Sequence, residues 1–128
     1  MNDVTLPAFF LNTLSVALAL ALASAGMGAE SAEELIQKGD VFYAKLQAAE
    51  ALKFYLPAEK LDSNNVRLLV RIARQYRHLM SDASTTKEKM VLGNTAVSYA
   101  ERAVALAPDD PEAQLLNAGR LVEAAVKK

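Results

Sequence analysis

Apolar residues recur every three or four positions along most of the chain, which is the repeat of an amphipathic α-helix. After residue 30, polar and proline-containing stretches divide this pattern into segments that we expect to be helices: about 31–46, 47–61, 65–80, 87–106 and 111–126. No stretch alternates apolar and polar residues, and no Asn-Gly or Asp-Gly hairpin turn occurs. Because those patterns are the signals of strands and hairpins, the sequence predicts an all-α fold.

Three of the expected helix starts carry capping residues. Ser31 and Thr85 are each followed three residues later by a glutamate, which is the pattern of a capping box. Asp110 precedes Pro111, and a proline at the first helical position loses no hydrogen bond. Pro57 lies inside the second segment, where it removes a backbone donor, so we expect a kink or an early helix end there.

The ends of the second and fourth segments resemble each other. AAEALKFYLPAEKLDSNN and TAVSYAERAVALAPDD align so that Ala58 matches Ala103 and Leu61 matches Leu106. Small residues should lie where helices approach closely, and large aromatic ones should fill the gaps between layers. The small ones are Gly39, Ala51, Ala58, Ala73, Ala96 and Ala103, and the aromatic ones are Phe42, Tyr55 and Tyr76.

This pattern resembles the tetratricopeptide repeat, a helix–turn–helix unit of about 34 residues. The resemblance implies a short right-handed superhelix of about two and a half repeats, with five helices in all. Residues 32–65 would form the first repeat, 66–110 an extended second repeat, and 111–126 a capping helix; together with Ser31 they make up a domain over 31–126.

The second repeat also resembles one particular branch. Proteins of the regulator-of-microtubule-dynamics family carry W-R-L-A-R and E-Y-A-K-R-A-L in the corresponding places. The matching residues here are Arg71-Ile72-Ala73-Arg74 and Ser98-Tyr99-Ala100-Glu101-Arg102-Ala103. The chain is similar to this family over roughly residues 32–125, and its layout also resembles that of bacterial exported tetratricopeptide proteins.

The N-terminal segment is apolar throughout. No charged residue occurs from Val4 to Ala29, and Ala23-Ser24-Ala25 fits a signal-peptidase site. We interpret residues 1–25 as a signal peptide and 26–30 as a linker, which predicts export, most simply to a bacterial periplasm. Retention of the segment as a membrane anchor and burial as a soluble helix are the alternatives, since about 20 apolar residues are enough to span a bilayer.

Charge and composition exclude several classes of function. From Glu30 onward the chain has 14 basic and 14 acidic residues, so no overall charge favours nucleic acid or an anionic membrane. We therefore expect membrane contact only through an uncleaved N-terminal segment. The absence of cysteine rules out a lipid-anchored lipoprotein, a disulfide and a thiolate zinc site.

Four arginines lie within eleven positions of the third helix, VRLLVRIARQYRHL. In a tetratricopeptide register this helix lines the concave groove, with Arg71 at the edge of the groove. Arginine binds carboxylates through two parallel hydrogen bonds. One hypothesis is therefore a groove that holds an acidic or C-terminal peptide segment of another protein, formed by Arg67, Val70, Arg71, Arg74, Arg77 and His78, with Asp40 and Tyr43 from the first helix.

The second hypothesis gives these arginines a structural role. The corresponding positions of the neighbouring helices are acidic, namely Glu33, Asp40, Glu112 and Glu123. Ion pairs with these residues would fix the stacking of the repeats, and exposed pairs contribute only about 0–1 kcal/mol each. The sequence leaves both roles open, and the two are compatible.

Little in the sequence indicates catalysis. His78 is the only histidine, and its helical neighbour Asp82 leaves it short of the three protein ligands of a catalytic zinc ion. We expect no enzyme activity, no metal and no cofactor, and we expect Gly93 to mark close packing. The predicted function is a protein–protein interaction module; the alternative is an assembly protein that self-associates, as a homo-oligomer, through the apolar side of its last helix, Leu115, Leu116, Leu121 and Val122.

Overall fold

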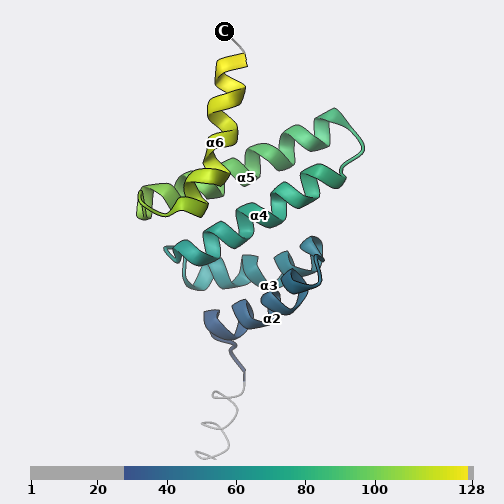
Figure 1. Ribbon diagram of the computed structural model, residues 1–128. Coiled ribbons are helices and arrows are strands. Elements are labelled where there is room, and N and C mark those ends of the chain that lie inside the picture. Colours follow the sequence, from purple (N-terminus) through teal and green to yellow (C-terminus); the bar gives the residue numbers. More distant parts are fainter. Residues whose placement is uncertain (1–27, 127–128) are drawn as a thin grey trace, which may run out of the picture. The chain divides into compact units, whose positions relative to one another are not determined.

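The computed structural model describes residues 28–126, with the side chains of the last helix as far as Ala118. These residues form five helices and no strand (Figure 1). The helices are α2 (Ala32–Ala44), α3 (Ala48–Leu61), α4 (Val66–Asp82), α5 (Thr86–Leu106) and α6 (Pro111–Val126). Each helix packs against the next, and α4 also contacts α6. The predicted all-α class is thus confirmed, and the succession of paired helices is consistent with a short helical repeat.

The helix starts follow the capping residues that the sequence contains. Ser31 and Glu34 form the complete capping box, with Ser31 Oγ accepting from the Glu34 amide at 3.2 Å and Glu34 Oε2 accepting from the Ser31 amide at 2.8 Å. Thr85 accepts from the Glu88 amide at 3.1 Å. Asn65 and Asp110 cap α4 and α6 in the same way, which satisfies donors that a helix start otherwise leaves unpaired.

The first helix ends two residues earlier than expected. Leu46 adopts a φ of 58°, the left-handed conformation that glycine usually supplies after a helix. The Gln47 amide donates to the Phe42 carbonyl and the Leu46 amide to the Tyr43 carbonyl, which is the hydrogen-bond pattern of a Schellman motif. With no glycine at this position, the sequence carries no local signal for the turn.

Pro57 does not end its helix. Of the two predicted outcomes, a kink or an early end, the early end does not occur, because α3 continues past Pro57 to Leu61. Both Pro57 and Lys53, whose carbonyl loses its partner, are exposed. Water can therefore hydrate the freed carbonyl, and the buried side of α3, including Tyr55 and Ala58, holds the helix together.

The core depends on small residues at the helix contacts. Tyr55 is fully buried between α2 and α4, and a Cβ placed on Gly39 would lie 2.5 Å from its ring. Ala51, Ala58, Ala73 and Ala103 are likewise fully buried. The predicted close packing at Gly93 is also present, because a Cβ there would lie 2.8 Å from Met80 Sδ. The small side chains that the sequence places in the helices thus lie at buried helix contacts.

The predictions for residues 1–25 fall outside the part of the chain that the structure describes, as does the start of the linker. Within residues 28–126, none of the helices combines the length and the apolar character that crossing a bilayer requires.

Candidate functional site

Helix α4 is strongly two-faced. Its apolar side is buried and includes Leu68, Leu69, Ile72 and Ala73. The opposite side carries the arginines, and the Asn65 cap fixes where the helix begins and therefore which way each side chain points. The register of α4 thus directs Arg67, Arg71 and Arg74, spaced three or four residues apart, toward α2 and α6.

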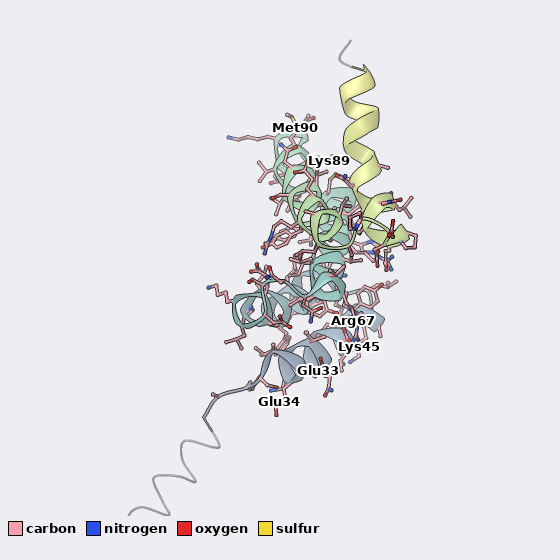
Figure 2. All side chains as sticks on the ribbon, turned by 90° about the vertical axis from the view of Figure 1, so that its left-hand side faces the viewer. Glu33, Glu34, Lys45, Arg67, Lys89 and Met90 are labelled. Atoms are coloured by element: carbon pink, nitrogen blue, oxygen red, sulfur yellow. The ribbon has the colours of Figure 1, made fainter. Side chains whose placement is uncertain are left out.

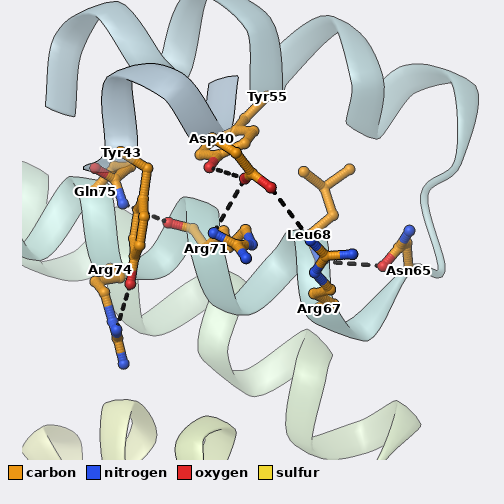
Figure 3. Close-up of polar contacts among 9 residues, drawn as sticks. All are labelled: Asp40, Tyr43, Tyr55, Asn65, Arg67, Leu68, Arg71, Arg74 and Gln75. Carbon is orange, nitrogen blue, oxygen red and sulfur yellow. Dashed lines mark hydrogen bonds and ion pairs between the residues drawn. The ribbon is translucent and has the colours of Figure 1, made fainter. Parts of the chain in front are cut away.

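Asp40 on α2 accepts hydrogen bonds from Tyr55 and Arg67 and forms an ion pair with Arg71, which lie on two other helices (Figure 3). The Tyr55 hydroxyl donates to Oδ1 at 2.5 Å, Arg71 Nη1 lies 3.0 Å from the same oxygen, and Arg67 Nη2 lies 3.2 Å from Oδ2. Burial, and then the hydrogen bond to Asp40, raise the pKa of Tyr55 above its usual range. Asp40 therefore joins α2, α3 and α4 at one carboxylate, with the Tyr55 hydroxyl as one of its donors.

Tyr43, one helical turn after Asp40, contacts two of the arginines. The guanidinium of Arg71 lies over its ring, 4.8 Å from the centroid, and that of Arg74 is at 5.9 Å. Arg74 also donates to the Tyr43 hydroxyl and pairs with Glu112 at the start of α6. Arg74 therefore links the first helix of the domain to the last.

These contacts border a pocket of about 470 Å³, here called the arginine pocket. Its wall is formed by α4, with contributions from α2, the end of α5 and the start of α6; the lining residues are Tyr43, Val66, Arg67, Val70, Arg71, Arg74, Ala107, Asp110 and Glu112. The three arginine side chains differ in access: 60% of Arg67 is exposed, 35% of Arg74 and 23% of Arg71. Arg67 thus retains donors that face solvent.

The residues predicted from the sequence separate into two groups. Tyr43, Arg67, Val70, Arg71 and Arg74 line the arginine pocket, and Asp40 holds two of its arginines. Arg71 lies in the middle of the set, between Asp40 and the Tyr43 ring, and not at the edge where the register placed it.

Arg77 and His78 lie elsewhere. Both are exposed, and Arg77 lines a second pocket formed by α4, α5 and α6. In Figure 2 the labelled residues of that second region, Lys89 and Met90 on α5, lie well apart from Arg67.

The proposed structural partners of the arginines are present in part. Asp40 and Glu112 form ion pairs with α4, whereas Glu33 accepts from Gln37 within its own helix. The side chain of Glu123 is outside the described residues. Sequence reasoning missed Val66, Ala107 and Asp110 as lining residues, because only the turn between α5 and α6 brings the last two beside α4.

A second polar cluster, on α3 and α5, contains the remaining described arginine. Arg102 pairs with Glu59 at 2.7 Å, donates to the Ser63 carbonyl at 3.1 Å, and lies over the Tyr99 ring at 5.4 Å. Tyr99 stacks on Tyr76 with 5.8 Å between ring centroids, and burial, followed by the nearby Glu59 charge, raises its pKa. These contacts join residues of α3, α4 and α5, so the cluster links three helices.

The described residues offer no metal centre, since no three of their acidic or histidine side chains gather closely enough to hold an ion. One carboxylate of the arginine pocket is already committed, because Asp110 accepts from the Ala113 amide at 2.8 Å. The chemistry available in the pocket is therefore hydrogen bonding and charge pairing by guanidinium groups.

Comparison with known proteins places the chain in a family. The family model described as regulator of microtubule dynamics protein 1-3 matches residues 35–119, which is 85 of the 128 residues. No curated protein matches the chain. Because the match covers about two thirds of the sequence, including all of α3, α4 and α5, this chain belongs to the regulator-of-microtubule-dynamics family.

Proposed function

We propose that this member of the family is a non-enzymatic interaction module, and that its arginine pocket binds an acidic segment or a C-terminal carboxylate of a partner protein. The observation that carries the proposal is the set of three guanidinium groups on one wall of one pocket, on successive turns of α4. Guanidinium groups bind carboxylates with two parallel hydrogen bonds, which gives both affinity and orientation.

Arg67 is the residue that we expect a ligand to reach first. It makes one contact with Asp40 at 3.2 Å, and more than half of its side chain is exposed. A guanidinium has five N–H donors, so most of its donors remain for a ligand. Its ion pair with Asp40 is exposed enough to contribute only about 0–1 kcal/mol, and exchanging it for a ligand carboxylate costs little.

Arg74 offers a second contact by exchange. It pairs with Glu112, whose side chain is 43% exposed, so a partner's carboxylate can replace that of Glu112. Arg71 is held more firmly by Asp40 and the Tyr43 ring. In this proposal Arg71 positions the pocket, while Arg67 and Arg74 contact the ligand. The structural and ligand-binding roles of the arginines are then complementary.

The test is a fluorescence-anisotropy titration with a labelled peptide of glycine and serine that carries a single pair of aspartates. We expect Arg67→Gln to weaken its binding by about fivefold to tenfold, the effect of one charge-assisted hydrogen bond. The control is Lys60→Gln, which removes one positive charge from an exposed position on α3 that lines neither of the two pockets. Equal losses in the two variants, or no binding to wild type, would contradict the proposal.

Tetratricopeptide architecture and export belong to the same proposal. The repeat pattern and the succession of helix pairs support a tetratricopeptide-type groove, and the uncharged stretch from Val4 to Ala29 supports export or membrane anchoring. Fractionation and mass determination of the protein expressed in a bacterium test this part. A periplasmic product that begins at Gly26 agrees with a cleaved signal, a membrane-bound full-length product agrees with an anchor, and a full-length soluble product contradicts both.

A second candidate function is self-assembly through α6, and one observation favours it. Leu115 on α6 is 65% exposed, and Leu106 at the end of α5 is 46% exposed. Apolar side chains left at the last helix of a stack are available to a second copy. Sedimentation velocity decides the point: self-association should be lost in Leu115→Asp, and a monomer at high protein concentration contradicts this candidate.

A further inference from the structure

The second pocket lies beside the arginine pocket, between α4, α5 and α6, and has a volume of about 360 Å³. It is here called the methionine pocket. Its lining is mainly apolar, with cationic and polar side chains among the apolar ones: Arg77, Met80, Thr86, Lys89, Met90, Gly93, Asn94, Ala96, Val97 and Leu116. Methionine side chains adapt to apolar groups of different shapes, which suits a pocket that receives a side chain from a partner.

The two pockets are lined by neighbouring turns of the same two helices. On α4, Arg74 lines the arginine pocket and Arg77, three residues later, lines the methionine pocket. On α6, Glu112 and Leu116 stand in the same relation, four residues apart. Residues three or four apart lie on one face of a helix. Both pockets therefore border the boundary between α4 and α6, one after the other.

We propose that the two pockets form one binding groove, in which the arginine pocket takes a carboxylate of the partner and the methionine pocket takes an apolar side chain of the same segment. This inference rests on the proposed function and specifies its ligand. The apolar lining favours Leu, Met or Phe as the side chain that enters the methionine pocket, because moving such a side chain from water into an apolar pocket is favourable.

Charge at the methionine pocket agrees with an acidic segment. Arg77 and Lys89 line it, both are exposed, and no ion pair joins either one to another side chain that the structure describes. Acidic residues beside the apolar anchor are thus favoured there, and basic ones are repelled. A partner segment rich in Asp or Glu around one large apolar residue fits both pockets.

The helix geometry predicts the spacing between the two anchors. On α4 the arginine pocket is centred near Val70, and the methionine pocket is lined by Arg77, Met80 and residues of α5 beyond them, so at 1.5 Å per residue the two anchors lie on the order of 10–20 Å apart. A peptide in the polyproline II conformation rises about 3.1 Å per residue and returns a side chain to the same side every three residues. The expected ligand therefore has its carboxylate and its apolar residue three or six positions apart.

The experiment uses the full chain and a set of labelled glycine–serine peptides, each with an aspartate pair and one leucine placed one, three or six residues from it, in both chain directions. The matched peptide has alanine in place of leucine. We expect leucine at spacing three or six, in one of the two directions, to bind about tenfold more tightly than alanine, and leucine at spacing one to give no gain.

Two adjacent, exposed residues of α5, Met90 and Val91, are the positions to substitute. Met90 lines the methionine pocket and is 57% exposed, whereas Val91 is 58% exposed and does not line it. Met90→Gln should remove most of the gain from leucine and leave the alanine peptide unchanged, while Val91→Gln should change neither. Because both positions are exposed, neither substitution threatens folding, and circular dichroism verifies this.

The outcomes separate the two proposals. If the aspartate peptides bind but leucine adds nothing at any spacing, the shared groove is wrong and the proposed function stands. The same holds if the gain from leucine survives Met90→Gln, because the leucine then binds elsewhere. If no peptide binds at all, the proposed function and this inference both fail.

Discussion

The guanidinium carbon of Arg71 lies 4.8 Å above the ring centroid of Tyr43, while its Nη1 is 3.0 Å from Asp40 Oδ1. The guanidinium of this α4 residue thus makes two contacts with α2. Its edge faces the Asp40 carboxylate, and its plane lies over the Tyr43 ring. With less than a quarter of the Arg71 side chain exposed, this arrangement fixes one wall of the arginine pocket before any ligand arrives.

Replacing Asp40 by asparagine should destabilise the domain. The substitution removes the charge that faces Arg71 and replaces one carboxylate oxygen by an amide donor, leaving a partly buried cation without its partner. We expect a loss of about 2 kcal/mol in the free energy of unfolding, measured by urea denaturation. Glu50→Gln is the control, since the Glu50–Lys53 pair is exposed and its removal should cost less than about 0.5 kcal/mol. Equal effects would show that Asp40 has no structural role.

Alanine at the two helical glycines should have opposite effects. At Gly39 the new Cβ meets the buried Tyr55 ring at 2.5 Å, so we expect a destabilisation of about 1–3 kcal/mol. At Gly93 the nearest atom is the sulfur of Met80, a flexible side chain that can move away. There the higher helix propensity of alanine should prevail and stabilise the domain by up to about 1 kcal/mol. Thermal denaturation of both variants checks the pair, and the account is wrong if Gly39→Ala melts no lower than Gly93→Ala.

Glycine at position 46 should stabilise the chain. Leu46 has a left-handed backbone conformation, which is sterically unfavourable for leucine. Its side chain is 82% exposed, so little packing offsets that cost. Leu46→Gly should raise the free energy of unfolding by about 0.5–1 kcal/mol. As a comparison, Leu61→Gly replaces another exposed leucine in the last turn of α3, where the backbone is helical, and should lower it. A loss of stability in both variants would contradict the left-handed turn.

Stability should fall in alkaline solution, partly because of Tyr55. Its pKa in the folded state is raised by burial and by the Asp40 hydrogen bond, above the value of about 10 in the unfolded chain. The folded state then holds its proton more tightly, so this contribution is complete below pH 10 and decreases as pH rises above it. Tyr55→Phe lacks the titrating group, so its free energy of unfolding should decrease less steeply above pH 10 than that of wild type. Parallel pH profiles would contradict this assignment.

Much of this architecture is predictable from local sequence. The capping residues Ser31, Thr85 and Asp110 predict the helix starts correctly, and Gly39 predicts a close contact with an aromatic layer. These features depend on residues that are near in sequence or on a repeat pattern. The left-handed turn at Leu46 was not predictable, because it is imposed on a residue that disfavours it.

The site was predictable only as a set of residues on one face of α4. The helical repeat groups Arg67, Arg71 and Arg74, but it does not say which of them lies between two helices and which faces solvent. That depends on where α2 and α6 cross α4. The same crossing puts Arg77 in the methionine pocket and brings Asp110 to the arginine pocket, 36 positions from Arg74 in the chain.

The most direct test of the central claim, that the arginine pocket binds a carboxylate, is to follow the arginine side-chain Nε–Hε signals by NMR while an aspartate peptide is added. The account predicts that the signals of Arg67 and Arg74 shift with one saturating binding curve, while that of Arg102, which is held by Glu59 and the Ser63 carbonyl, stays in place. Shifts confined to Arg102, or small unsaturated shifts of all arginines alike, would contradict it.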